Sequence, residues 1–199
     1  MEIIKILERV GALLHGHFVG ASGRHLDTYI NKDALYPNTK EVSKVGRLFA
    51  QKNKNLNIDV IVAPALGGII LSQWTAYHLS KLKKKKILGI YTEKDKDDNQ
   101  VLRRGYDKLV KGKNILIVED ITTTGGSVKK VIESVRMAGG KVKRASVMVN
   151  RDSKNVNSTT IGALFSSLGI LAAKSWDKND CPMCKKGIPI DTQVGHGRL

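Results

Sequence analysis

The chain has 199 residues, and its 34 Lys and Arg against 18 Asp and Glu give a formal net charge of +16. This length suits one domain with a sizeable core. We find no apolar run long enough to span a bilayer and no charged-then-apolar N-terminal signal pattern. Because no such run is present, we expect no membrane association. Two cysteines are too few for a disulfide framework, so we expect a cytoplasmic protein. The positive charge suits nucleic acid, but it equally suits a substrate with several phosphates.

The predicted elements alternate between helix and strand along most of the chain. Apolar residues at helical spacing predict a helix over 2–15, residues 16–37 are irregular and polar, and Thr39 is expected to cap a second helix. Short apolar, β-branched runs then predict strands at 58–62, 87–91, 114–118 and 144–149, with helices after the first and third. This alternation predicts an α/β fold with a parallel sheet and right-handed crossovers.

The most informative stretch is residues 114–127, which read N-I-L-I-V-E-D-I-T-T-T-G-G-S. A buried strand here would deliver Glu119 and Asp120 to the C-terminal edge of the sheet, where open α/β folds bind ligands. The threonine and glycine loop then opens a helix, whose N–H groups and dipole attract anions. Acids beside an anion site suit a phosphorylated sugar. A plain strand, turn and helix capped by Ser127 would explain the glycines but not two charges directly after a buried strand.

This segment resembles the phosphoribosyl-diphosphate (PRPP) motif of the type I phosphoribosyltransferases. The resemblance implies a parallel core sheet flanked by helices, with a small N-terminal hood. It implies that Glu119 and Asp120 act in catalysis by accepting hydrogen bonds from the ribose hydroxyls. The implied site for the 5′-phosphate is the loop formed by Thr122, Thr123, Thr124, Gly125, Gly126 and Ser127.

Other segments resemble orotate phosphoribosyltransferases. Residues 18–32, F-V-G-A-S-G-R-H-L-D-T-Y-I-N-K, look like a segment near the start of those enzymes, and residues 181–189 resemble the tail of a bacterial and archaeal subset. The implied base-binding residues are Arg151, Tyr29 and Ser22. The implied diphosphate-binding residues are Leu66, Gly67, Gly68 and Arg103.

The activity implied is transfer of 5-phosphoribose from PRPP to a nucleobase, most simply orotate, giving orotidine 5′-monophosphate and diphosphate. Many orotate enzymes have lysine at position 21, serine at 26 and lysine at 67, where this chain has Ala21, Leu26 and Gly67. These departures leave a purine or xanthine salvage enzyme as the runner-up. A PRPP-sensing nucleic-acid-binding regulator is the alternative outside enzymes. The sequence shows no second recognition helix, so we do not expect nucleic acid binding.

The charged stretch 92–105 lacks apolar periodicity, and polar segments of this length are unusual unless they are functional or disordered. The resemblance implies a lid whose Lys94 and Lys96 close over the diphosphate, in related enzymes across a dimer interface. We therefore expect a homodimer. Mg²⁺ held mainly through PRPP and diphosphate is the expected cofactor, so the sequence need not supply a metal cage.

Cys181 and Cys184 offer two ligands, whereas a structural zinc site needs four. A dimer could supply four thiolates, but two packed free thiols are the simpler reading, so we expect no metal here. We expect His25 to be a surface or structural residue. The predicted organisation is a single domain 1–199, with a hood over about 1–40, a core over about 41–152 and a C-terminal arm over about 153–199.

Overall fold

The structure is a computed structural model that describes residues 1–20, 23–172 and 174–194. Its core is a six-stranded sheet in the order β5-β4-β3-β6-β7-β8. Neighbouring strands are parallel except at the edge, where β5 runs antiparallel to β4. The strands span Val60–Pro64 (β3), Leu88–Lys94 (β4), Gln100–Val101 (β5), Asn114–Thr122 (β6), Lys141–Asn150 (β7) and Phe165–Ile170 (β8). The predicted α/β class with a parallel sheet is confirmed.

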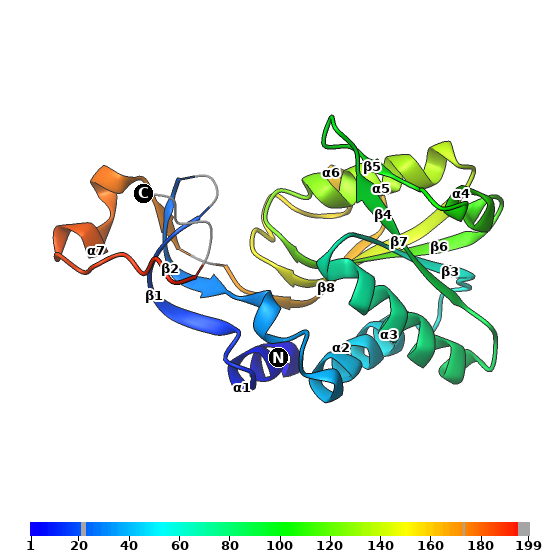
Figure 1. The fold of residues 1–199 in the computed structure, drawn as a ribbon, viewed down its shortest axis with the longest axis horizontal. Helices are drawn as coiled ribbons and strands as arrows, with labels where there is room; N and C mark the ends of the chain where they lie inside the picture. The colour runs from blue at the N-terminus through cyan, green and yellow to red at the C-terminus, as the bar shows by residue number, and fades with distance from the viewer. Residues whose placement is uncertain (21–22, 173, 195–199) are drawn as a thin grey trace.

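Helices cover both faces of this sheet (Figure 1). One face carries α2 (Thr39–Lys52) and α3 (Gly67–Lys83), and α1 (Glu2–Arg9) packs into the same apolar cluster. The other face carries α5 (Gly126–Met137), with the short α4 (Tyr106–Val110) and α6 (Ser158–Ile161). Side chains alternate along β6, so Leu116 and Val118 join the first cluster while Ile115 and Ile117 join the second. Burial on both faces explains the continuous apolar run that predicted this strand.

The order of strands reverses between β3 and β6. From β3 the chain passes through α3 to β4 on one side, and from β6 it passes through α5 to β7 on the other. The loops at the carboxyl ends of β3 and β6 therefore lie at the switch point of the sheet, where open α/β folds bind ligands. Both predicted PRPP-binding segments follow these two strands.

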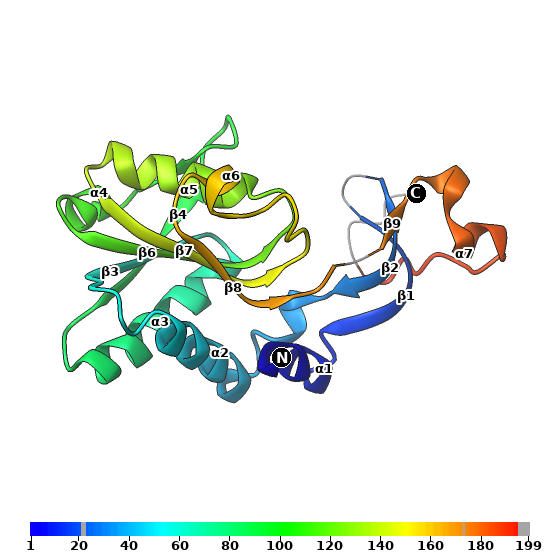
Figure 2. The same ribbon diagram turned by 180° about the vertical axis from the view of Figure 1, so that it is seen from behind.

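A second sheet forms a hood that projects to one side of the core (Figures 1 and 2). It contains β1 (Leu13–Val19), β2 (His25–Ile30) and β9 (Ser175–Trp176) in the order β1-β2-β9, with antiparallel neighbours. The turn η1 (Lys32–Ala34) returns the chain to the core. After β9, the turn η2 (Lys178–Asp180) and α7 (Pro182–Lys185) stay beside the hood. The hood is thus built from both ends of the chain.

Several predicted boundaries differ from those observed. The helix expected over residues 2–15 ends at Arg9, because the chain turns at Gly11 (φ +69°) into β1. β6 continues to Thr122, so both acids lie within the strand. The stretch 92–105 contains an antiparallel pairing of β4 with β5, because Glu93 and Lys94 face Val101 and Gln100. β8 lies beyond residue 152, so the sheet extends into the predicted C-terminal arm.

Within the described ranges, every helix is too short or too polar to cross a membrane.

Helices α2 and α3 pack closely at Gly46. A Cβ built on this glycine would lie 2.5 Å from Cβ and 2.7 Å from the carbonyl carbon of Trp74. Helix propensity alone predicts that Gly46→Ala stabilises the protein by about 1 kcal/mol. The overlap predicts the opposite, a net loss of about 1–3 kcal/mol in the free energy of unfolding. Urea denaturation measures the difference, with exposed Arg47→Ala as the control in the same helix. A stabilised Gly46→Ala protein would contradict the close packing.

Candidate active site

Two adjacent carboxylates are buried near the end of β6. Glu119 is 7% exposed and Asp120 is 3% exposed. Because successive strand residues point to opposite faces, Asp120 lies on the α2–α3 side. There its Oδ2 accepts a hydrogen bond from the Tyr36 hydroxyl at 2.8 Å and pairs with the Lys32 ammonium at 2.9 Å. Its Oδ1 accepts from the Ile121 N–H at 2.6 Å.

Glu119 is less well satisfied. Its Oε1 accepts from the Asp120 N–H at 3.3 Å, whereas its Oε2 is buried and has no hydrogen-bond partner within the described chain. Burial, followed by the charge of Asp120, raises the pKa of the Glu119 carboxyl well above its usual range. An unpaired buried oxygen of this kind is an acceptor that a ligand hydroxyl could satisfy.

Lys32 and Tyr36 were not among the predicted site residues. Burial is the largest single influence and by itself lowers the pKa of Lys32, but the charge and hydrogen bond of Asp120, together with the charges of Glu119 and Asp33, raise that pKa overall. Burial first, and Asp120 second, raise the pKa of Tyr36 well above its usual range, which keeps the phenol protonated as a donor. Both residues lie in or near η1, in a stretch with no periodicity. Asp120 lies more than 80 residues further along the chain, so no local sequence pattern could predict that these residues contact it.

The loop after β6 leads directly into a helix. The Gly125 N–H donates to Thr122 Oγ1 at 3.0 Å, and the Gly126 N–H donates to Thr124 Oγ1 at 3.4 Å. Gly125 has φ +80°, and a Cβ there would lie 2.5 Å from Ile161 Cδ1, so glycine is required. Thr123, Thr124, Gly126 and Ser127 are exposed. The first N–H groups of α5 lack partners within the helix, so they can bind an anion.

The loop after β3 lies against Asp120. A Cβ on Gly67 would overlap Asp120 Oδ2 and the Tyr36 hydroxyl, and a Cβ on Gly68 would lie 2.8 Å from that of Ala63. Both glycines are therefore needed for close packing. Leu66 is 84% exposed, and α3 starts directly after it at Gly67. The structure thus brings the predicted diphosphate loop to the acid pair, while its ligand stays a prediction.

A pocket of about 590 Å³ lies between the hood and the core. It joins the exposed part of the β6–α5 loop to Tyr29 and Arg151, two of the predicted base-binding residues. Arg151 Nη2 donates to the Thr28 carbonyl at 3.0 Å, and burial is the main cause that lowers the pKa of Arg151. Ser22, the third, lies outside the described residues. The lining comprises Gly20, Arg24, Leu26, Tyr29, Thr123, Thr124, Arg151, Asp152, Ser153, Lys154, Ala172 and Ser175.

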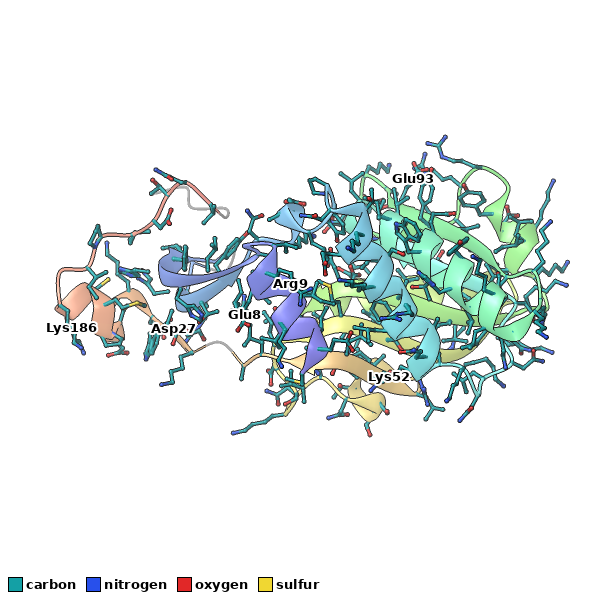
Figure 3. The ribbon with its side chains drawn as sticks, turned by 90° about the horizontal axis from the view of Figure 1, so that it is seen from below. Glu8, Arg9, Asp27, Lys52, Glu93 and Lys186 are labelled. Carbon is teal, nitrogen blue, oxygen red and sulfur yellow. The ribbon has the colours of Figure 1, made fainter. Side chains whose placement is uncertain are left out.

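The predicted lid residues lie elsewhere. Lys94 pairs with Asp98 at 2.8 Å within its own hairpin, and Lys130 Nζ donates to the Asp98 carbonyl at 2.7 Å. Lys96 and Arg103 are exposed and, like Lys94, are absent from the lining of this pocket. Figure 3 shows Glu93, in β4, over the core and far from Asp27 and Lys186 in the hood region. Among the described residues, Lys94 pairs with Asp98 and Asp120 pairs with Lys32, and no ion pair or hydrogen bond joins the predicted lid lysines to the two acids.

Comparisons with known proteins agree with this architecture. The model of the phosphoribosyl transferase domain matches residues 31–166. A curated relative from Caldanaerobacter subterraneus subsp. tengcongensis, named orotate phosphoribosyltransferase, is 38% identical over 95% of this chain and 94% of its own length. The protein of that name from Thermotoga maritima is 36% identical over 98% of both chains.

Solved structures show the same fold. The orotate phosphoribosyltransferase of Aeropyrum pernix matches with a TM-score of 0.66 at 27% identity, covering 86% of this chain and 94% of that one. That of Mycobacterium tuberculosis matches with a TM-score of 0.68 at 21% identity, covering 86% and 95%. The acid pair and the glycine-containing loop lie at the point where the strand order reverses, as in an α/β enzyme whose ligand binds at the carboxyl ends of the strands. The chain belongs to the phosphoribosyltransferase family, as the motif of residues 114–127 predicted.

The environment of Glu119 predicts an unusual dependence of stability on pH. Its folded-state pKa is raised, so its contribution to stability is complete below the unfolded-state pKa and is lost as pH rises through the folded-state pKa. Glu119→Gln removes this loss. We expect the variant to be more stable than wild type by on the order of 1 kcal/mol at pH 8, with a smaller difference at pH 5. Thermal denaturation from pH 5 to pH 8 measures it, with exposed Glu133→Gln as the control. A stability difference between the variant and wild type that does not change with pH would contradict the raised pKa of Glu119.

Proposed function

We propose that this protein transfers 5-phosphoribose from PRPP to orotate, forming orotidine 5′-monophosphate and diphosphate in pyrimidine nucleotide synthesis. The observation that carries the proposal is the buried pair Glu119 and Asp120 beside the loops that follow β3 and β6 at the switch point. The curated relatives named orotate phosphoribosyltransferase, which match along nearly the full chain, support orotate as the base.

The 5′-phosphate, the ribose and the diphosphate of PRPP each suit a different group of residues at the switch point. The 5′-phosphate would take the N–H groups and hydroxyls of residues 122–127, at the N-terminus of α5. The ribose hydroxyls would donate to Glu119 and Asp120, and Glu119 Oε2 has an unused lone pair for this purpose. The diphosphate would lie by Leu66, Gly67 and Gly68, where the N-terminus of α3 favours negative charge.

In the proposed reaction, N1 of orotate forms a bond to C1′ of the ribose while the bond from C1′ to diphosphate breaks. The base loses its N1 proton to solvent water, and the electron pair of the broken bond leaves with diphosphate. Positive charge develops on the ribose, and the two acids lie where they would stabilise it electrostatically. Mg²⁺ is the proposed cofactor, and it would act as a Lewis acid on the leaving diphosphate. The unpaired Glu119 Oε2, close to the proposed ribose site, is compatible with such a magnesium-bound substrate.

The pocket between hood and core suits an anionic base. Arg24, Arg151 and Lys154 line it, with Asp152 as the one acidic residue among its described lining. Orotate carries a carboxylate, which a guanidinium can bind through two parallel hydrogen bonds. Tyr29 offers an aromatic face beside Arg151. Arg24 already pairs with Asp177 at 2.9 Å, so orotate would bring an anion to Arg151 and Lys154 that a neutral purine lacks.

We further propose that Lys94 and Lys96, with Arg103, act on diphosphate bound to a second copy of the chain in a homodimer. The support is their position, because the three side chains are exposed and Lys94 pairs with Asp98 of its own hairpin rather than with either acid. A lid from a second copy would also exclude water, which competes with the base as nucleophile. The proposed setting is the cytoplasm, with PRPP and the base as partners.

Removing both negative charges should weaken PRPP binding. Each hydrogen bond to a charged group is worth about 1.5–3 kcal/mol, so Glu119→Gln with Asp120→Asn should lower the affinity at least about 100-fold. Calorimetry with PRPP and Mg²⁺ measures it, and circular dichroism checks folding. The control is the exposed pair Asp107→Asn with Glu133→Gln. Unchanged PRPP affinity in the folded variant would sink the assignment of the site.

Base choice is tested by diphosphate release with PRPP, Mg²⁺ and one base at a time. We expect release with orotate and little with uracil, adenine, guanine, hypoxanthine or xanthine. Arg151→Gln should raise KM for orotate about 10–100-fold. It should also reduce the preference of the enzyme for orotate over uracil, because uracil lacks the carboxylate. Exposed Arg47→Gln is the control. Diphosphate release with a purine, and with no other base, would contradict orotate as the acceptor. Silence with every base despite PRPP binding would favour a PRPP-sensing regulator.

A further inference from the structure

Four side chains with metal-binding atoms converge in the hood, away from the acid pair. They are His17, His25, Cys181 and Cys184, and one ligand atom from each lies within 4.8 Å of every other. His17, His25 and Cys181 are buried, with 2%, 3% and 0% exposure, and Cys184 is partly buried. Among the residues that the structure describes, this is the one cluster of its kind.

The distances suit a tetrahedral zinc ion. Zn–S and Zn–N bonds of about 2.3 Å and about 2.0–2.1 Å place neighbouring ligand atoms about 3.3–3.8 Å apart. The sulfur of Cys181 lies 3.6 Å from His17 Nε2, and that of Cys184 lies 3.7 Å from the same nitrogen and 3.4 Å from His25 Nδ1. The two imidazole nitrogens are closer, at 2.6 Å, and would separate to admit the ion.

The surroundings of His17 direct a lone pair into the cluster. Its Nδ1 lies 2.8 Å from the carbonyl oxygen of Ile188. Because a carbonyl only accepts, Nδ1 carries a proton, and in the neutral imidazole Nε2 then has a lone pair that faces His25 and both sulfurs. Metal-binding histidines typically donate their second N–H to such a carbonyl. Convergence of this lone pair with a second imidazole and two thiols therefore points to a cation rather than to a plain hydrogen-bond network.

We propose that His17, His25, Cys181 and Cys184 form a structural zinc site that fastens the C-terminal segment to the hood hairpin. The donor set of two thiolates and two neutral imidazoles neutralises a divalent ion, and four protein ligands leave no open position for substrate. Soft sulfur ligands in a tetrahedral arrangement favour zinc over magnesium or calcium. The ligands join β1 and β2 to η2 and α7, which are over 150 residues apart in the chain.

The zinc site supports the wall of the base pocket. The hood supplies Arg24, Leu26 and Tyr29 to the pocket lining, and β9 supplies Ser175. Apart from a short pairing of β2 with β9, the C-terminal segment is held to the hood by few backbone bonds, such as Asp191 N–H to the His17 carbonyl at 2.7 Å. Loss of zinc should therefore loosen the hood while leaving the PRPP loops of the core unchanged. This consequence for the base rests on the proposed function, whereas the metal site does not.

The first test is the metal content of the full-length protein, purified under reducing conditions from zinc-supplemented medium. We expect one zinc per chain in wild type and in His15→Ala, a control with an exposed histidine in the same hairpin. We expect less than one tenth of this in Cys184→Ser and His25→Ala. After replacement with cobalt, the wild-type protein should show the absorption bands of tetrahedral thiolate coordination. Wild type without zinc, or with a disulfide between the two cysteines by mass spectrometry, would overturn the proposal.

The second test separates the site from catalysis. Removal of zinc from the wild-type holoenzyme should lower the melting temperature by several degrees. It should raise KM for orotate more than tenfold, with PRPP affinity changed less than twofold, and added zinc should restore both values. If the enzyme proves inactive with every base, metal content and melting temperature still decide the site. Zinc bound without any change in melting temperature on its removal would contradict a structural role.

Discussion

The contact between Asp120 and the pair Lys32 and Tyr36 holds the site together. It joins the end of β6 to the segment that leaves the hood, at distances of 2.9 and 2.8 Å. Gly67 packs against the same atoms, so the loop after β3 is part of the arrangement. A buried carboxylate is costly unless it is paired and hydrogen-bonded. The hydrogen bond and ion pair that Asp120 requires therefore fix the end of β6, the loop after β3 and the segment that leaves the hood relative to one another.

Glu119, one residue earlier, is held differently. Its Oε2 is buried without a hydrogen-bond partner in the described structure. One acid of the pair is thus saturated by the protein while the other keeps an acceptor free. A sugar with adjacent hydroxyls suits such a pair because it can donate to two neighbouring carboxylates.

The core and the hood have different tasks and different sources of stability. The core buries two apolar clusters, one on each face of the sheet, and its loops form the proposed PRPP site. The hood is a three-stranded sheet completed by a two-residue strand from the far end of the chain. Sheets of this size have little core of their own. A metal site is a common way to stabilise such a unit, and in this protein it would also place the wall of the base pocket.

The sequence by itself determined the α/β class, the family and the paired acids with their loop. These features are local, since an apolar run, two charges and a glycine-containing turn lie within residues 114–127. It did not predict Lys32 and Tyr36 beside Asp120, or His17 and His25 beside the cysteines. The pair Cys181 and Cys184 supplied only two ligands on its own. The two histidines come from strands separated from them by the whole core, so only tertiary folding brings the four together. Local patterns specify elements and their loops, whereas contacts between the two ends of a chain depend on how those elements pack.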